Sequence, residues 1–389
     1  MKVIYLSSLC SKKEYERMFN IYGTTSSHAS QKFHRSIVQG LTENGLNVTA
    51  LSYRAISKPQ LDDLIKEPDV ESKVMINYLP HHKTSKLNRV YTIFKTYGFL
   101  HKWFKENKDG VICSDIINGE FSIAIFIFSI LHKCKKVAIV TDVPSCRAMD
   151  TRKGLKSIPP KIKNYLIQQF DGYVFLTEQM DSLLNPKHKP FVVMEGVIDE
   201  SAAQVPNVYE NKYSECVCMM AGLLEKEFGV DTLLEEFSKI DNDDLKLNFY
   251  GKGKSVQLIL DYSKKDKRIC YGGELLNSQI LEEERKSTLL INPRPPIGEW
   301  TKYSFPSKNI EYISSGTPMI AYKLDGMPKE YYGHFYHIKD GDIGKTLREV
   351  LEYSREELHQ FGCSAREWIL KEKTPKNQTE SLAKLIRNF

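Results

Sequence analysis

The stretch INPRPPIGEWTKYSFPSKNIEYISSGTPMIAY, residues 291–322, decides the fold that this sequence predicts. An apolar run predicts a strand near 288–292, a Pro-rich loop follows it, and a helical pattern covers 306–315. Pro306 suits the first helical position, and Gly316 suits the residue just past the helix end. PMIAY then begins another strand. Strand, helix and strand in succession are typical of a parallel sheet covered by helices.

The start of this predicted helix has the features of an anion site. The free N–H groups of a first helical turn and the helix dipole both favour negative charge. Lys308 lies in that turn, where a cation opposes the dipole, so its presence predicts that an anion binds there. Glu311 shares a helix face with Lys308, and its carboxylate can accept hydrogen bonds from a diol such as a ribose. The alternative is an ordinary pair of charges on the surface of an amphipathic helix.

The same alternation of strands and helices runs through the whole chain. Strand patterns lie near residues 2–7, 47–53, 73–79, 110–114, 136–140, 172–176, 190–194, 215–221, 245–250, 268–272, 288–292 and 318–322. Helical patterns separate them, for example near 29–44, 160–170, 229–240, 276–285 and 306–315. We therefore predict an α/β protein with two Rossmann-like, doubly wound domains facing a cleft, with ligands beyond the carboxyl ends of the strands.

The length of 389 residues also favours two domains. The polar, Pro-containing segment at 200–213 shows no sustained apolar period and is the expected boundary. We predict an N-terminal domain over 1–205 and a C-terminal domain over 206–389. The terminal helix of the second domain is expected to pack back on the first.

Composition and charge restrict the setting and the partners. No signal-peptide pattern opens the chain, and the apolar run at 121–131 is shorter than the about 20 residues of a membrane span, so it predicts a buried helix. Residues 1–200 hold 28 Lys and Arg against 20 Asp and Glu, and residues 201–389 hold 27 against 29. We expect a cytoplasmic protein with reduced cysteines, whose basic half suits an anionic partner. No nucleic-acid motif is present.

The deciding stretch resembles the donor-site motif of retaining GT-B glycosyltransferases of the family-4 type. It is similar to their bacterial cell-surface polysaccharide branch, which carries SFPSK-x-x-EY followed by G-T-P. The matching residues are Ser304, Phe305, Pro306, Ser307, Lys308, Glu311, Tyr312, Gly316, Thr317 and Pro318. The resemblance extends to 221–237, to FYGKGK at 249–254 and to YGGELL at 271–276, whereas the first domain matches in outline only.

The resemblance implies a role for Glu311 and shows one departure. In such enzymes the later Glu of an E-x(7)-E pair binds the nucleotide ribose, which is the position of Glu311. The earlier Glu contacts the donor sugar, but that position is Tyr303 here. Glu299 is the nearest substitute, at a different spacing.

A second departure concerns the cations that hold the donor diphosphate. Related enzymes use an Arg and a Lys near the start of the second domain, and the corresponding positions here are Leu223 and Phe228. Lys302, Lys308 or Arg294 would have to replace them.

Other motifs suggest a turn near the donor and exclude a metal site. Gly251 and Gly253 belong to no complete P-loop or dinucleotide-binding fingerprint. They are expected either in a turn that approaches the donor phosphates or in a plain turn. Gly273 and Glu274, in the similar YGGELL segment, complete the expected donor-binding residues. Asp241-Asn242-Asp243 precedes a strand, so it is interpreted as a loop rather than as a metal site. We expect no metal and no cofactor.

The first domain offers weaker candidates. Asp115 and Asp142 each follow a predicted strand, and Asp142 could orient or deprotonate the acceptor hydroxyl or merely cap a turn. His28 and His34 bracket the start of a helix and could face the site or be surface histidines. Residues 81–108 interleave basic and aromatic residues, which predicts either contact with an anionic membrane or a helix packed on the sheet.

Together these features predict a metal-independent glycosyltransferase that resembles hexosyltransferases. It would move a sugar from a nucleotide diphosphate, expected to be a UDP-sugar, to a hydroxyl. The resemblance implies that the N-terminal domain binds the acceptor and that the C-terminal domain binds the sugar nucleotide. The partners expected are that sugar nucleotide, a glycan, lipid-linked or protein-linked acceptor, and the inner face of the membrane. Two alternatives remain open at this point. One is a sugar-nucleotide epimerase of the same architecture, and the other is a catalytically silent partner subunit.

Overall fold

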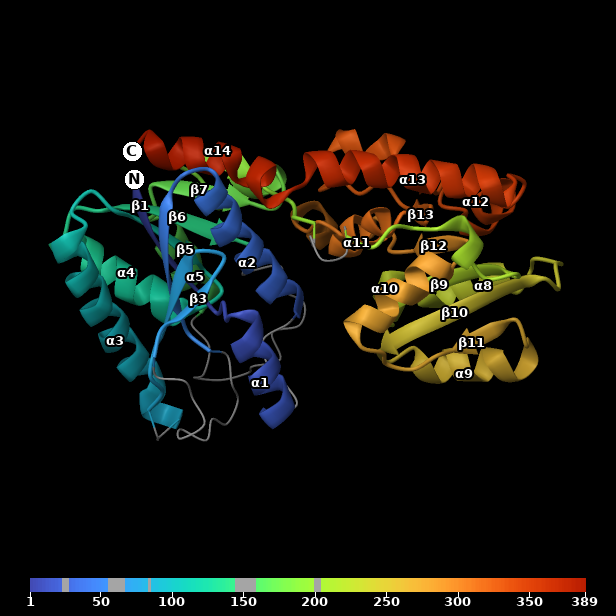
Figure 1. Ribbon diagram of the computed structural model, residues 1–389, viewed down its shortest axis with the longest axis horizontal. Helices are drawn as coiled ribbons and strands as arrows, with labels where there is room; N and C mark the ends of the chain where they lie inside the picture. The colour runs from blue at the N-terminus through green and yellow to red at the C-terminus, as the bar shows by residue number, and fades with distance from the viewer. Residues whose placement is uncertain (23–27, 55–66, 83–84, 144–158, 199–203) are drawn as a thin grey trace. The chain divides into compact units, whose positions relative to one another are not determined.

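The computed structural model describes residues 1–22, 28–54, 67–82, 85–143, 159–198 and 204–389. The chain forms two compact units (Figure 1). Unit 1 contains Met1–Val197 together with Pro375–Phe389, and unit 2 contains Ile198–Thr374. The chain therefore leaves unit 1 near residue 197 and returns to it for its last helix.

Unit 1 is built on an eight-stranded sheet in the order β3-β4-β2-β1-β5-β6-β7-β8. Its neighbouring strands are parallel, except that the edge strand β3 pairs antiparallel with β4. The strands are β1 (Lys2–Ser7), β2 (Asn47–Ser52), β3 (Asp69–Glu71), β4 (Val74–Tyr78), β5 (Val111–Asp115), β6 (Lys135–Val140), β7 (Gly172–Phe175) and β8 (Phe191–Val193). The described helices are α1 (Lys12–Tyr22), α2 (His28–Glu43), α3 (Ser85–Glu106), α4 (Gly119–Leu131), α5 (Pro160–Ile167), α6 (Gln179–Leu184) and α14 (Pro375–Arg387).

The central strands β1, β5, β6 and β7 of unit 1 are buried almost throughout, as expected for strands covered by helices on both faces. One hydrophobic cluster joins β1, β2 and β4 to α2 and α14, through residues such as Val3, Val38 and Ile386. Helices α3 and α4 pack against each other. Phe121 and Phe128 of α4 are fully buried, which confirms the helix predicted over 121–131, but Ile130 and Leu131 at its end are exposed.

Unit 2 is built on a six-stranded, fully parallel sheet in the order β11-β10-β9-β12-β13-β14. Counted along the chain this is the order 3-2-1-4-5-6 of a Rossmann domain. The strands are β9 (Cys216–Leu223), β10 (Leu245–Lys252), β11 (Ile269–Tyr271), β12 (Leu289–Asn292), β13 (Met319–Ala321) and β14 (Tyr336–His337). The α-helices are α8 (Val230–Phe237), α9 (Val256–Lys265), α10 (Asn277–Lys286), α11 (Ser307–Ser315), α12 (Ile343–Val350) and α13 (Arg355–Glu372).

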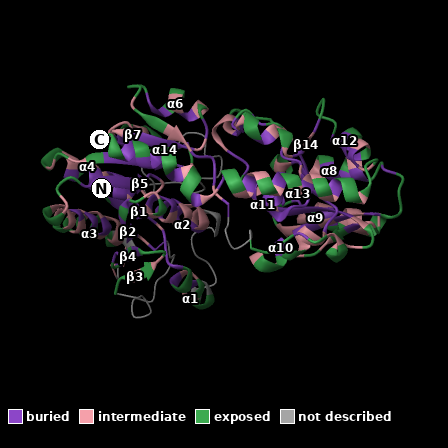
Figure 2. Ribbon diagram, turned by 45° about the horizontal axis from the view of Figure 1, so that its top comes forward, coloured by how far each residue is buried: buried purple, intermediate pink, exposed green. Residues whose placement is uncertain are grey.

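Two hydrophobic clusters line the two faces of this second sheet. Helices α8, α9 and α12 contribute to one cluster, and α10, α11 and α13 contribute to the other. The sheets of both units are buried between helices whose outer faces are exposed (Figure 2). Helices α10 and α11 thus lie on the same face and contact each other, which brings their side chains together.

The predicted α/β class with two Rossmann-like domains is confirmed. The predicted strands agree with the observed ones to within two residues at each end. The sequence did not reveal β3 and β14, which have three and two residues and are too short to show a period. Helix α11 begins at Ser307, one residue later than predicted, with Pro306 just before it, and Gly316 ends it in a left-handed conformation at φ 78°.

Candidate functional site

The candidate site lies in unit 2 at the carboxyl ends of β9 and β12. These strands are neighbours, and the chain continues from β9 to β10 on one side and from β12 to β13 on the other. In doubly wound sheets, ligands bind where the strand order reverses in this way. Gly222 lies near the end of β9, and a Cβ built on it would lie 3.5 Å from Cε of Lys308. The first turn of α11 therefore meets this point of the sheet.

Two hydrogen bonds hold α11 in place there. The N–H of Ala221 in β9 donates to the Tyr312 hydroxyl oxygen at 2.8 Å. The side-chain amide of Asn292, which ends β12, donates to the Asn309 side-chain oxygen at 2.6 Å. Both strands of the reversal point thus fix the position of the helix that carries Lys308 and Glu311.

Lys308 forms a small charged cluster with two carboxylates. Its ammonium pairs with Glu311, and it lies 3.6 Å from Oε1 of Glu284 on the neighbouring helix α10. The Lys308 side chain is 31% exposed, whereas the Glu284 side chain is fully buried. Tertiary packing therefore places a third, buried carboxyl group against the Lys308–Glu311 pair, a neighbour that an ordinary surface pair lacks.

Burial and charge act in opposite directions on this cluster. Burial lowers the pKa of Lys308, but the Glu311 and Glu284 carboxylates outweigh it and raise that pKa above its usual range, so Lys308 stays charged. Burial, reinforced by the Glu311 charge, raises the pKa of Glu284 well above that of a free carboxyl. Lys308 and Glu311 together can meet the phosphates and the sugar hydroxyls of a nucleotide.

Arg294 is a second cation at this edge of the sheet. It follows β12, is only 6% exposed, and lies 4.3 Å from the ring centre of Trp300 and 5.9 Å from that of Phe228. One guanidinium nitrogen donates to the Ser304 hydroxyl at 3.0 Å, while Nε has no hydrogen-bond partner among the described residues. Burial lowers the pKa of Arg294 to about 10, which leaves it charged at neutral pH.

The remaining residues of the motif divide into surface and core positions. Lys302 and Tyr303 lie in the short helix Glu299–Tyr303, where Lys302 pairs with Glu299 at 3.2 Å. Ser307 is exposed at the start of α11. Phe305 is buried 5.2 Å from the Tyr331 ring, so its side chain belongs to the hydrophobic core, and a ligand could meet only its backbone. The predicted donor-site role of Phe305 therefore concerns its backbone, because its side chain faces inward under α11.

The glycines after β10 serve the close approach of two chain segments. A Cβ on Gly251 would lie 1.9 Å from the Gly222 carbonyl oxygen, and one on Gly253 would lie 2.0 Å from that of Leu224. Their φ angles of +124° and +159° also favour glycine. Packing of β10 against the end of β9 thus explains both glycines without a ligand.

Gly273 and Glu274 follow β11 at the same edge. Gly273 has a φ of +77°, with open space where a Cβ would lie. Glu274 is exposed and pairs with Lys252 at 3.0 Å.

In unit 1, the candidate residues differ in their exposure to solvent. Asp142 follows β6 and is exposed. Asp115 ends β5 and is buried 3.4 Å from Nε2 of His34, whose Nδ1 lies 2.7 Å from the Tyr5 hydroxyl. The prediction of a surface histidine is wrong for His34, because α2 turns this residue toward the sheet. The side chain of His28 lies outside the described residues.

The segment 81–108 has a buried side and an exposed apolar side. His81 is buried, and burial lowers its pKa to about 4, while Leu100 of α3 packs in the core. Leu87, Val90 and Phe94 form an exposed apolar stripe on α3, with Phe94 70% exposed. No helix within the described ranges has the length and apolar character needed to cross a bilayer.

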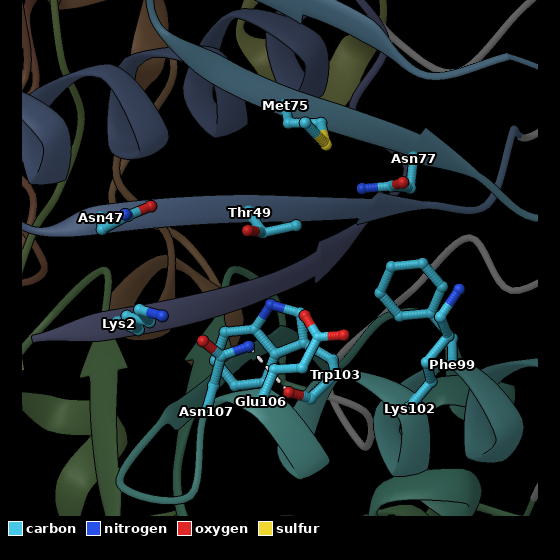
Figure 3. Close-up of a pocket in the computed structure, with 10 residues that line it drawn as sticks. All are labelled: Lys2, Asn47, Thr49, Met75, Asn77, Phe99, Lys102, Trp103, Glu106 and Asn107. Atoms are coloured by element: carbon cyan, nitrogen blue, oxygen red, sulfur yellow. Dashed lines mark hydrogen bonds between the residues drawn. The ribbon is translucent and has the colours of Figure 1, made fainter.

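A groove in unit 1 has different surroundings from the candidate site. It has a volume of about 380 Å³ and lies between α3 and the strands β1, β2 and β4 (Figure 3). Lys2 and Asn47, the first residues of β1 and β2, line it together with Trp103 and Glu106 of α3. It therefore starts at the amino ends of the strands, away from the edge where doubly wound sheets bind ligands.

The structure adds Glu284 to the residues that the sequence indicated. Glu284 lies one helical turn after Ile280 and Leu281, both buried, so a charged residue on the apolar face of the predicted helix was the available signal. Within the described part of the chain, no group of three or more His, Cys, Asp or Glu side chains is placed to hold a metal ion.

Comparison with known proteins gives a partial family match and a whole-chain fold match. Residues 215–353 match the sequence profile of a family described as glycosyl transferases group 1. A search of curated proteins found no match. Among solved structures, the chain resembles a sucrose-phosphate synthase from Thermosynechococcus elongatus with a TM-score of 0.67 and 12% identity, over 100% of this chain and 99% of that chain.

Two further solved structures resemble the chain over its whole length. The lipopolysaccharide outer core galactosyltransferase WaaB has a TM-score of 0.63 and 14% identity, over 100% of this chain and 99% of that chain. HepE of Anabaena, in complex with UDP-glucose, has a TM-score of 0.62 and 10% identity, over 100% of both chains. At these identities the likeness concerns the fold, and the chain has the GT-B fold with two Rossmann-like domains.

Proposed function

We propose that this protein is a retaining, family-4-type glycosyltransferase that transfers a sugar from a nucleotide diphosphate to a hydroxyl acceptor in the synthesis of a cell-surface polysaccharide or glycoconjugate. The observation that carries the proposal is the cluster of Lys308, Glu311 and Glu284 at the point where β9 and β12 diverge. It lies inside the region that matches the glycosyltransferase family, and in a fold whose solved members include complexes with UDP. A UDP-sugar is therefore the donor we expect.

The chemical task of such an enzyme is to stabilise the charge that develops on the departing diphosphate. The N–H groups at the start of α11 and the Lys308 ammonium both suit that charge. Glu311, three residues further along the same helix, suits the ribose hydroxyls as an acceptor. These groups can act without a divalent metal, so we propose that the reaction is metal-independent.

Arg294 is our candidate for the cation that the resemblance finds missing. Phe228 replaces the expected Lys, and the Arg294 guanidinium lies 5.9 Å from its ring centre. Arg294 also has an unpaired Nε among the described residues, and a buried donor without a partner favours binding of an acceptor group. The aromatic rings of Phe228 and Trp300 hold the guanidinium in place by cation–π contact.

The acceptor is proposed to bind on unit 1, with the help of a membrane surface. Asp142 is exposed after β6, where it can orient an acceptor hydroxyl. The exposed stripe of Leu87, Val90 and Phe94 offers an apolar surface beside the basic residues of α3, which suits an anionic bilayer and a lipid-linked acceptor. We accordingly propose a cytoplasmic location at the inner face of the membrane.

A thermal-shift screen followed by a transfer assay tests the proposed function. Because a ligand that binds the folded state stabilises it by mass action, UDP and the true UDP-sugar should raise the melting temperature, also after treatment with EDTA. GDP-, dTDP- and CMP-sugars serve as the comparison. Absence of any shift would favour a silent partner subunit, and conversion of the donor without an acceptor would favour an epimerase. Complete loss of transfer in EDTA, restored by Mn²⁺ or Mg²⁺, would contradict metal independence.

A further inference from the structure

Glu284 is the most unusual charged residue of the described chain, because it is fully buried and its carboxylate is poorly compensated. Its side chain has no exposed surface, and its two oxygens accept no hydrogen bond from any described residue. Among the described residues, its only ion pair is the 3.6 Å contact with Lys308. A buried, charged carboxylate with a single cation beside it lowers the free energy of unfolding unless the group is protonated. A residue of this kind is therefore a candidate for a functional role.

The surroundings of Glu284 do not give it a purely structural role. Thr317 donates to the backbone carbonyl of Glu284, not to its carboxylate. The neighbouring Glu283 makes the structural contacts of this turn, since it accepts from the hydroxyls of Tyr213 at 2.5 Å and Tyr250 at 3.1 Å. The Glu284 carboxyl instead faces the cluster on α11.

We propose that Glu284 is a positioning residue for Lys308, which keeps the ammonium at the end of β9 when Glu311 leaves it to bind the ribose of the donor. The inference rests on the proposed function and extends it by one residue. In the free protein, Lys308 is shared by two carboxylates on two helices. Because Glu311 cannot hold Lys308 and a ribose with the same oxygens, a second acceptor is needed to keep the ammonium aimed at the diphosphate.

The protonation state of Glu284 decides how well the site accepts a diphosphate. Burial and the nearby Glu311 raise the pKa of Glu284, which favours its protonated form, and a protonated carboxyl still offers its carbonyl oxygen to Lys308. The charged or titratable groups that face it are Lys308, Glu311 and Tyr312 on α11. As pH rises through the raised pKa of Glu284, the site gains one negative charge and should bind the donor diphosphate less well.

Two variants of Glu284 separate this role from a structural one. Glu284→Gln keeps the shape and a neutral acceptor, whereas Glu284→Leu keeps similar bulk but offers no acceptor. At pH 7 with UDP-glucose, or the UDP-sugar found in the screen, Glu284→Gln should keep kcat within about twofold. Glu284→Leu should lower kcat by about tenfold or more, because Lys308 is a preorganised donor that would no longer be held in place. Glu282→Gln, an exposed change on the same helix, is the matched control, and melting temperatures verify that all variants are folded.

The pH profile gives the decisive readout. The donor KM of the wild type should rise on the alkaline side of its pH profile, and Glu284→Gln should remove that rise while Glu282→Gln retains it. An active wild type with a flat profile, or an unchanged rise in Glu284→Gln, would overturn the positioning role alone. A wild type that neither binds UDP nor turns over any UDP-sugar would instead overturn the proposed function.

Discussion

At the scale of single residues, Lys308 is the group on which the proposed chemistry depends most. Its ammonium is held between Glu311 and Glu284 at the end of β9, and it should meet charge that grows as the diphosphate departs. Lys308→Met keeps most of the aliphatic stem and removes the charge. We expect kcat to fall by about 10²-fold or more, the scale for losing one preorganised donor to developing charge. Steady-state kinetics at saturating donor measures this.

The control for this variant is Lys339→Met, because Lys339 forms an exposed pair with Glu349 in the same unit. Lys308→Met should remain folded, since Glu284 can become neutral, with a loss of about 1–3 kcal/mol from the free energy of unfolding. Wild-type kinetics in a folded Lys308→Met protein would remove Lys308 from the site.

Glu311 should affect the enzyme in a different kinetic parameter. If its carboxylate binds the ribose equally in the ground and transition states, Glu311→Gln should raise the donor KM by more than it lowers kcat. Initial-rate measurements over a range of donor concentrations separate the two parameters. A loss confined to kcat with an unchanged KM would argue against ribose binding, and Glu349→Gln provides an exposed comparison.

At the scale of elements, helix α3 has one side in the hydrophobic core and another exposed to solvent. Leu100 faces the core, whereas Leu87, Val90 and Phe94 recur at helical spacing on the exposed side. An apolar stripe that is exposed in water contributes nothing to folding, but it can enter the interface of a bilayer. The lysines of the same helix then suit anionic headgroups.

Phe94→Ala should therefore weaken membrane binding without weakening the fold. A Phe side chain contributes about 1.5–3 kcal/mol when it is buried, so co-sedimentation with phosphatidylglycerol vesicles should fall by roughly tenfold or more. The binding should also decrease with salt, since screening shortens to about 8 Å at physiological ionic strength. Leu276→Ala, an exposed apolar change in unit 2, should leave the binding unchanged. Equal binding of the wild type to neutral phosphatidylcholine vesicles would contradict the proposal.

At the scale of the whole molecule, the chain returns to its first unit at the end. Helix α14 contributes Leu382, Ala383 and Ile386 to the core of unit 1, and the Asn44 side chain donates to the Lys376 carbonyl at 2.8 Å. Gly40 of α2 permits this packing, because a Cβ there would lie 2.1 Å from the Pro375 carbonyl oxygen. The last residues of the chain are thus part of the core of the first unit.

Gly40→Ala tests this packing, and Gly98→Ala is a comparison for which the expected change in stability has the opposite sign. Gly40→Ala should lower the free energy of unfolding by about 1–3 kcal/mol, as overpacking pushes α14 from α2. Gly98→Ala, in the exposed part of α3 with nothing within 4 Å of the added carbon, should raise stability by up to about 1 kcal/mol through helix propensity. Thermal and denaturant unfolding measure both. A stabilised Gly40→Ala protein would show that α14 does not need this close contact.

The sequence by itself determined the strand and helix alternation, the α/β class, the start and end of α11 to within one residue, and the pairing of Lys308 with Glu311. These features depend on periodicity and on contacts three or four residues apart, which local spacing specifies. The match of SFPSK-x-x-EY to a known family added the expected chemistry. The residues of this match lie within one short segment of the chain.

Only the tertiary structure decided the features that depend on residues far apart in the chain. Glu284 meets Lys308 because α10 and α11 pack on the same face of the second sheet, and His34 is buried because α2 turns it toward Asp115. Arg294 and Phe228 come together from the loops after β12 and β9. Burial, and with it the charge state of a carboxyl or a histidine, is set by such packing between distant segments, so no local pattern in the sequence could specify it.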